Sequence, residues 1–304
     1  MIAIADLTHL STISDNRPKA GSVVVEKTFA ERLADLVVSA LVDEVTLTPK
    51  PGLVDMRSRG AHRDLNWGLM CHSAWVLHPT FYAMAVAGET ITDPSRLREE
   101  IGRIGRDGEM QMMAATGGVN THRGAIWALG LLVTAAAQDR QALTASAVAS
   151  RAAMMARYHD QFSPIVTGNK GEQACRTYGV GGARAQAQAG FPHVIDVALP
   201  ALNYWRIRGE GEDAARLNAL LAIIAKLDDT CVLSRGGLEA LVAIQTGAHT
   251  VLRLGGAGSL EGKACLQAFE AELLERHISP GGAADLLAAA LFLDQLKKEF
   301  PART

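Results

Sequence analysis

The stretch HRGAIWALGLLVTAAAQ, residues 122–138, decides the fold. After its first two residues it carries only two polar side chains, Thr134 and Gln138, so apolar groups surround almost the whole circumference of a helix. A helix of this kind is buried inside a protein or spans a membrane. The stretch is shorter than the roughly 20 residues needed to cross a bilayer. We therefore expect a central helix enclosed by other helices.

The rest of the chain is also typical of packed helices. Of its 304 residues, 48% are hydrophobic and only 5% are aromatic, which suits helices better than sheets. No repeat or Pro/Ser-rich linker divides the chain after its first 25 or so residues. We predict a poorly structured segment over 1–24, then one compact all-α domain over 25–304, with a polar cleft lined by the loops between helices.

Helical periodicity and capping signals predict where the helices lie. Two prolines and a glycine in 49–52 end the first helix, and the glycines of 116–118 place the amino end of the central helix on an open turn. No βαβ unit and no Rossmann or Walker glycine motif occurs. The expected helices are 25–46, one after Asp64, one from Pro94 towards Met113, 122–138, 144–159, 170–178, 182–190, 194–208, 212–227, 235–253, 260–276 and 282–299.

Charge and cysteine usage exclude several classes of partner. The net charge is −2 and no long run of one sign occurs, which favours neither nucleic acid nor an anionic membrane. A small molecule is the expected partner. The amino terminus has no basic region before its apolar start, and the four cysteines form no CxxC pair. Both features fit a cytoplasmic protein with reduced thiols.

Two acidic residues follow apolar helical stripes. Glu44 continues the positions 33, 37 and 40, and Asp228 continues 217, 221 and 224. A buried carboxylate costs several kcal/mol unless it meets a cation, a metal or several donors. A structural ion pair is the alternative for Glu44. Together with Asp229, these acids are candidate ligands for Mg²⁺, the usual partner of nucleoside triphosphates.

Two stretches combine a stiff or glycine-rich backbone with charge. TPKPGLVD (48–55) carries Lys50 and Asp55 and continues into GAHRD (60–64), so it can pre-organise a cation, acids and a histidine. An ordinary interhelical connection is the alternative. GGVNTHRG (117–124) sets a basic pair at a helix amino terminus, where amides and the macrodipole favour anions. A simple glycine turn with a threonine N-cap is the alternative.

The last helix begins at SPGG (279–282), with Asp285 about one turn inside it. An acidic residue near a helix start is favourable by itself, so this pattern alone implies no chemistry.

In wording and order these segments resemble the triphosphoribosyl-dephospho-CoA synthases that serve malonate decarboxylase and citrate lyase. The resemblance covers most of the chain, and the wording GARAQAQAGFPHV (182–194) is closer to the malonate decarboxylase branch. It rests on EVTLTPKPGLVD (44–55), GAHRD (60–64), GVNTHRGAI (118–126), YGVGGARAQAQAGFP (178–192), DDTCVLSRGG (228–237) and SPGGAADLLAAALFL (279–293).

The resemblance implies an all-α transferase that joins ATP to 3′-dephospho-CoA and releases adenine. A separate phosphoribosyl-dephospho-CoA transferase would then attach the product to an acyl-carrier subunit. Mg²⁺ is expected as a cofactor, and a homodimer is allowed.

The implied reaction calls for acids near the ribose, a donor for adenine and cations for phosphate. Glu44, Asp55, Asp228 and His62 are the predicted catalytic residues, with Asp229 and Asp285 as further acids. The predicted substrate contacts are Lys50, Asp64, Asn120, Thr121, His122, Arg123, Arg184, Arg235, Ser279, Gly281, Gly282 and Asp285.

Two other functions stay open from the sequence. One is a magnesium-dependent helical nucleotide hydrolase, in which water replaces dephospho-CoA as the nucleophile. The other is a non-catalytic assembly factor that binds the carrier subunit through a hydrophobic groove.

Overall fold

A computed structural model describes residues 26–164 and 166–301, and within these residues the protein is all-α, with no strand. The segment over 1–24 that was predicted to be poorly structured lies outside this part of the chain. The helices are α1 Phe29–Thr46, α2 Trp67–Val76, α3 His78–Thr90, α4 Pro94–Ala115, α5 Arg123–Gln138, α6 Ala145–Arg157, α7 Lys170–Tyr178, α8 Gly182–Gln188, α9 Leu199–Ile207, α10 Glu212–Ile224, α11 Thr230–Arg253, α12 Leu260–Glu275 and α13 Gly281–Glu299, with a π-helical turn at His193–Ala198 and a 3₁₀ turn at Gly256–Gly258.

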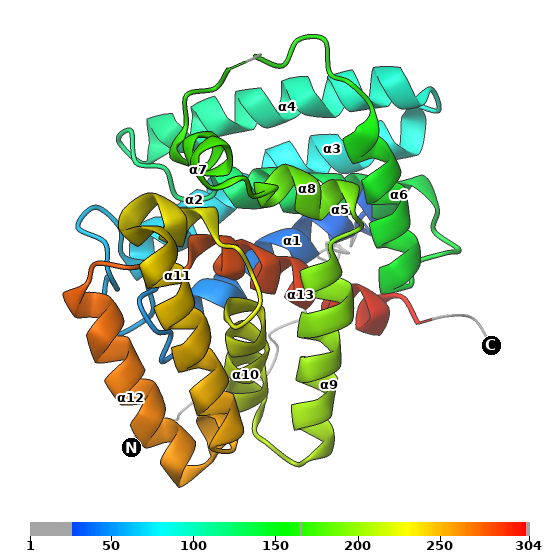
Figure 1. Ribbon diagram of the computed structural model, residues 1–304. Coiled ribbons are helices and arrows are strands. Elements are labelled where there is room, and N and C mark those ends of the chain that lie inside the picture. Colours follow the sequence, from blue (N-terminus) through cyan, green and yellow to red (C-terminus); the bar gives the residue numbers. More distant parts are fainter. Residues whose placement is uncertain (1–25, 165, 302–304) are drawn as a thin grey trace, which may run out of the picture.

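Helix α5 is the central helix, as predicted. Every residue from Ala125 to Ala137 except Trp127 is buried. It packs against α1, α3, α4, α6 and α13, and Figure 1 shows it in the interior beside α13. The second interior helix, α13, packs on α1, α5 and α10, and its buried face runs through Leu286–Leu293. The apolar surface of these two helices fixes where the others pack.

Capping residues explain where several helices begin, including α1, which starts at Phe29 and not at the predicted residue 25. Thr28 forms a capping box with Glu31 at the start of α1, and Asp93 accepts from the Arg96 amide before Pro94 in α4. The single helix expected after Asp64 is instead two, α2 and α3, divided at Leu77. Pro79 explains the division, because proline has no amide hydrogen to continue the α2 ladder.

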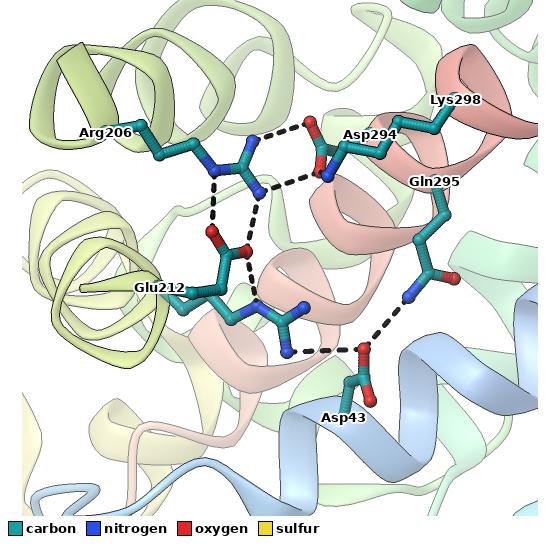
Figure 2. A network of polar contacts seen from close by, with 7 residues as sticks. Asp43, Arg206, Glu212, Asp294, Gln295 and Lys298 are labelled. Carbon is teal, nitrogen blue, oxygen red and sulfur yellow. Dashed lines mark hydrogen bonds and ion pairs between the residues drawn. The ribbon is translucent and has the colours of Figure 1, made fainter. Parts of the chain in front are cut away.

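An ion-pair network ties α1, α9, α10 and α13 together (Figure 2). The Arg206 guanidinium donates to Glu212 at 2.6 and 2.8 Å and to Asp294 at 2.8 and 2.9 Å. Arg216 continues the chain of contacts from Glu212 to Asp43 of α1. Each of these charged groups has a partner of opposite charge, so we interpret the network as one that holds the helices together.

A membrane-spanning helix is not found between residues 26 and 301, the unplaced residue 165 aside: no helix there is long and apolar enough to cross a bilayer.

Candidate active site

The centre of the site is a buried ion pair between Glu44 and Lys50. Glu44 lies on the core face of α1, as its spacing predicted, and is 5% exposed, while Lys50 is 1% exposed. The Lys50 ammonium donates to Glu44 Oε1 at 2.5 Å. Burial nevertheless raises the pKa of Glu44, because loss of solvent outweighs the opposing charge of Lys50. A carboxylate held this way is a stronger base than one in water.

Asp55 organises the loop that carries Lys50. Its carboxylate accepts from the Lys50 amide at 3.2 Å, the Arg57 amide at 2.8 Å and the Ser58 amide at 3.0 Å. The Arg57 guanidinium adds a further bond at 2.8 Å. Its lone pairs are therefore used within the 48–58 segment. The geometry fits a residue that shapes the loop better than one that removes a proton from substrate.

His62 joins three segments that are far apart in sequence. Its Nε2 lies 2.8 Å from Ser279 Oγ before α13, and its Nδ1 lies 3.4 Å from Arg235 Nη2 on α11. Burial, and then the charge of Arg235, lower the pKa of His62 to about 4. The ring is therefore neutral at physiological pH. Asp64, 4.0 Å from the ring, is largely exposed.

The amino end of α5 presents His122 to the interior. The N-cap position of α5 is occupied by His122 and not by Thr121, the N-cap in the alternative interpretation of this segment. Its Nδ1 lies 2.9 Å from Ser73 Oγ of α2, and Ser73 Oγ lies 2.6 Å from Thr121 Oγ1. Its Nε2 is buried and has no hydrogen-bond partner in the described part of the chain. Burial and the charge of Lys50 lower the pKa of His122 to about 4.

The polar residues that flank His122 are already engaged. Asn120 Oδ1 accepts from the Arg123 amide at 3.2 Å. Arg123 Nε donates to Glu109 of α4 at 2.6 Å, and its guanidinium makes a second contact with the same oxygen. An incoming phosphate would have to displace Glu109 to take both bonds of Arg123. Gly117 and Gly118 have open space around them, but the Gly118 amide donates to the Met113 carbonyl at 2.7 Å and is therefore also engaged.

Asp229 connects the starts of α11 and α13. It is 2% exposed, accepts from the Cys231 amide at 2.8 Å as N-cap of α11, and accepts from the Ala283 amide at 3.0 Å. A Cβ at Gly282 would lie 3.0 Å from Asp229 Oδ1. Glycine at 282 therefore allows the two helix ends to meet.

Asp285 is the least satisfied acid of the group. Its carboxylate rests on the first turn of α5, where a Cβ at Gly124 would lie only 2.0 Å from its Oδ2. Burial raises the pKa of Asp285 well above its usual value, and the charges of Glu44 and Asp229 raise it further. No hydrogen bond from the described residues offsets these effects. The carboxyl of Asp285 therefore has lone pairs that no described residue occupies.

The prediction that Asp228 points inward is wrong. α10 ends at Ile224 and not at 227, so the helical stripe does not extend to residue 228, which is exposed. The buried acid is its neighbour Asp229. Arg184 is likewise exposed, on α8, whereas Gly281 lies in the cluster, close to the Cys231 sulfur.

The predicted Mg²⁺ ligands, Glu44, Asp228 and Asp229, do not form a metal site. Glu44 is bonded to Lys50, Asp228 faces outward and Asp229 is bonded to helix amides. Among the residues placed in the structure, no group of three His, Cys, Asp or Glu side chains is arranged to hold a metal ion. No catalytic step is therefore assigned to a protein-bound metal.

Sequence reasoning missed Ser73 and Glu109. Ser73 is a lone small polar residue in the apolar helix WGLMCHSAWV, and Glu109 is one of several charges on α4. Both matter through contacts with the start of α5. Nothing local in either helix signals such a contact.

The fold and the buried polar cluster define an all-α enzyme, and the comparisons with known proteins make it a transferase. The sequence model described as ATP:dephospho-CoA triphosphoribosyl transferase matches residues 30–304, and the chain belongs to that family.

Close relatives carry a consistent name. A protein of Azotobacter vinelandii, named as a probable 2-(5″-triphosphoribosyl)-3′-dephosphocoenzyme-A synthase, is 54% identical over 91% of this chain and 95% of its own length. A protein of Klebsiella pneumoniae, named as the synthase without qualification, is 53% identical over 87% of this chain and 94% of its own. No solved structure matches the chain.

Proposed function

We propose that the protein makes 2′-(5″-triphosphoribosyl)-3′-dephospho-CoA from ATP and 3′-dephospho-CoA and releases adenine. The family and the names of the relatives support this reaction. One structural observation supports it for this chain: Lys50 is bonded to Glu44, and these two charges lie close enough to His122 and Asp285 to shift the pKa values of both.

The reaction exchanges one bond to the ribose C1′ of ATP for another. The bond from C1′ to adenine N9 breaks with its electron pair on adenine, and the 2′-oxygen of dephospho-CoA bonds to C1′. The hydroxyl loses one proton and adenine gains one, so protons balance. Such substitutions pass through a transition state with positive charge on the ribose. The site must supply a base, negative charge near C1′ and a donor for adenine.

Asp285 is the proposed base for the 2′-hydroxyl. Its raised pKa strengthens it as a proton acceptor, and its open lone pairs can reach a hydroxyl without breaking an existing bond. Glu44 is the proposed charge that stabilises the ribose cation, because Lys50 holds it in place. Neutral His122 is the proposed donor to adenine.

Cations around the cluster are the proposed triphosphate contacts. Lys50 is fixed by the Asp55 loop. Among the residues that the structure describes, Arg235 bonds only to His62 and to the carbonyls of Ala61 and His277, at 3.5 and 3.3 Å. Weak bonds of this length are readily exchanged for phosphate oxygens. Ser279 is a further hydroxyl donor at the same place.

Product analysis tests the proposal directly. Purified protein is incubated with ATP, with and without 3′-dephospho-CoA, and adenine release is followed by chromatography while the conjugate is identified by mass spectrometry. Adenine is expected only with the acceptor present. Diphosphate or AMP release without acceptor would instead indicate a hydrolase, and the absence of any turnover would favour an assembly factor. Glu44→Gln is expected to abolish the conjugate while the protein stays folded.

We also place the product upstream of a carrier-protein prosthetic group. The wording of residues 182–194 supports malonate decarboxylase over citrate lyase as the destination. A downstream phosphoribosyl-dephospho-CoA transferase would consume the product, and production of holo-carrier in a coupled assay with either carrier subunit separates the two branches.

A further inference from the structure

Ser73 lies between two residues of the site without belonging to any motif described above. It is 0% exposed. Its Oγ is 2.6 Å from Thr121 Oγ1 and 2.9 Å from His122 Nδ1. Within the described residues, the Ser73 hydroxyl is therefore the hydrogen-bond partner of both His122 Nδ1 and the Thr121 hydroxyl. These three side chains form a short hydrogen-bond chain that ends at the imidazole.

A hydroxyl has one hydrogen, so Ser73 can donate to only one of its two partners, and three orders of this chain are possible. In the first, Thr121 donates to Ser73, Ser73 donates to Nδ1, and the single ring hydrogen of neutral His122 sits on Nε2. In the second every bond is reversed, the ring hydrogen sits on Nδ1, and the Thr121 hydroxyl hydrogen is left without a protein acceptor. In the third, Thr121 and Nδ1 both donate to Ser73 Oγ, and the hydrogen of the buried Ser73 hydroxyl has no acceptor among the described residues. Only the first order gives both hydroxyl hydrogens a protein acceptor, so it is the most stable of the three.

We propose that Ser73 is a positioning residue that holds His122 in the tautomer with its hydrogen on Nε2. The inference rests on the proposed transferase reaction for its purpose: the Nε2 hydrogen is offered to a ring nitrogen of adenine as the bond to C1′ breaks. Electron density moves into the purine during that step, so its nitrogens become stronger acceptors.

The surroundings of His122 fit this role. Nε2 is buried without a partner, and a buried donor costs free energy until an acceptor reaches it. Burial and the nearby Lys50 charge lower the pKa of His122 to about 4, so the ring stays neutral. A neutral imidazole has one donor and one acceptor. Fixing the acceptor on Ser73 leaves the donor for the ligand.

The tautomer is measured directly by long-range ¹H–¹⁵N spectra of protein labelled in its histidine rings, at pH 7. His122→Gln identifies the His122 signals by their loss. The wild type is expected to show a pyridine-like Nδ1 and a pyrrole-like Nε2. Ser73→Ala is expected to give averaged shifts from both tautomers. A wild-type ring with its hydrogen on Nδ1, or no change in Ser73→Ala, would overturn the proposal.

Matched variants separate the hydrogen-bond chain from packing. Thr121→Ser keeps the hydroxyl and is expected to retain the wild-type tautomer, while the near-isosteric Thr121→Val removes it and is expected to populate both. Thr134→Val is the control on the same helix, because the Thr134 hydroxyl donates to the Gly130 carbonyl at 2.8 Å. It should leave the His122 signals unchanged. Equal spectra for the two Thr121 variants would contradict the chain.

Kinetics distinguish failure of this inference from failure of the proposed reaction. Ser73→Ala is expected to lower kcat for adenine release about tenfold, with KM for ATP nearly unchanged, because the donor acts in the transition state. Loss of the tautomer with unchanged kcat would overturn the catalytic purpose of Ser73. If wild-type protein releases no adenine, the transferase proposal fails, while the spectra still decide the tautomer.

Discussion

Two networks of charged residues, one around Arg206 and one around Lys50, differ in the direction in which the fold shifts the pKa values of their carboxyl groups. Around Arg206 (Figure 2), hydrogen bonds lower the pKa of Glu212 to about 2 and also lower that of Asp294. Around Lys50, burial raises the pKa of Glu44 and of Asp285. The first environment stabilises ionised groups and the second opposes them.

The difference follows from the number of partners. Asp294 accepts from Arg206 and Lys298, whereas no described residue donates to Asp285. Charges gathered without full compensation lower stability. A folded protein retains such a group where chemistry requires it. The direction of the pKa shifts therefore distinguishes the structural network from the proposed catalytic cluster.

The largest expected effect compares two Asp→Asn changes on α13. Asp285→Asn removes the proposed base and should lower the rate of conjugate formation by roughly 10²–10⁴-fold. Asp294→Asn makes the same chemical change in the structural network and should leave the rate per folded molecule within about twofold of wild type, since it does not touch the site. Steady-state assays of both variants check this. Similar rates would remove Asp285 from the catalytic set.

The next effect concerns the stability held in the structural network. Arg206→Met breaks four hydrogen bonds to carboxylates and should lower the free energy of unfolding by about 2 kcal/mol. Urea denaturation measures it. Arg103→Met is the control, because Arg103 pairs with Glu100 and Asp107 on the exposed surface of α4. Arg103→Met should lower the free energy of unfolding by less than about 0.5 kcal/mol. If both variants lowered it equally, the Arg206 network would stabilise the fold no more than an exposed ion pair does.

Protonation of Glu212 at acid pH should remove the stabilising contribution of the same network within a defined pH range. The pKa of Glu212 is about 2 in the folded state, chiefly because Arg206 bonds to it, against 4.5 as its ordinary value. Because its pKa is lower in the folded state, ionised Glu212 stabilises the folded protein. This contribution is complete above a pH of about 4.5 and is lost as the pH falls towards 2. Since Glu212 is 43% exposed, solvent screening reduces the contribution to about 1 kcal/mol.

Unfolding free energies of wild type and Glu212→Gln at pH 6 and pH 3 check this contribution. The advantage of the wild type should shrink at pH 3. A difference that is constant with pH would assign the effect to packing.

The sequence predicted those features that are local to one helix. The position of α5 follows from its uniform apolar surface, and the inward direction of Glu44 follows from its stripe because α1 continues past it. The same reasoning failed at Asp228, since α10 stops at Ile224 without a glycine or proline to mark its end. A stripe predicts direction only while the helix lasts.

Contacts between distant segments account for what the sequence did not reveal. Asp285 reads as an ordinary residue in a helix start, and only the approach of Gly124 from α5 shows why it is unusual. The role of Ser73 likewise depends on its contact with His122. The Asp55 carboxylate accepts its hydrogen bonds from residues of its own loop. Residue type and spacing name the candidates, whereas partners decide which of them remain free to react.

The smallest expected effect is a gain of stability at the site itself. The folded-state pKa of Asp285 is raised, so the wild type loses stability as the pH rises above the ordinary carboxyl value of 3.8. Asp285→Asn removes the ionisable group, so the gain in stability over the wild type should be small at pH 4 and larger at pH 7. Urea denaturation at both pH values measures this, with Asp294→Asn expected to lose stability at pH 7. A gain equal at both pH values would mean that the amide simply packs better. A gain that grows with pH, in the variant that also loses activity, would show that the cluster keeps a destabilising charge for its chemistry.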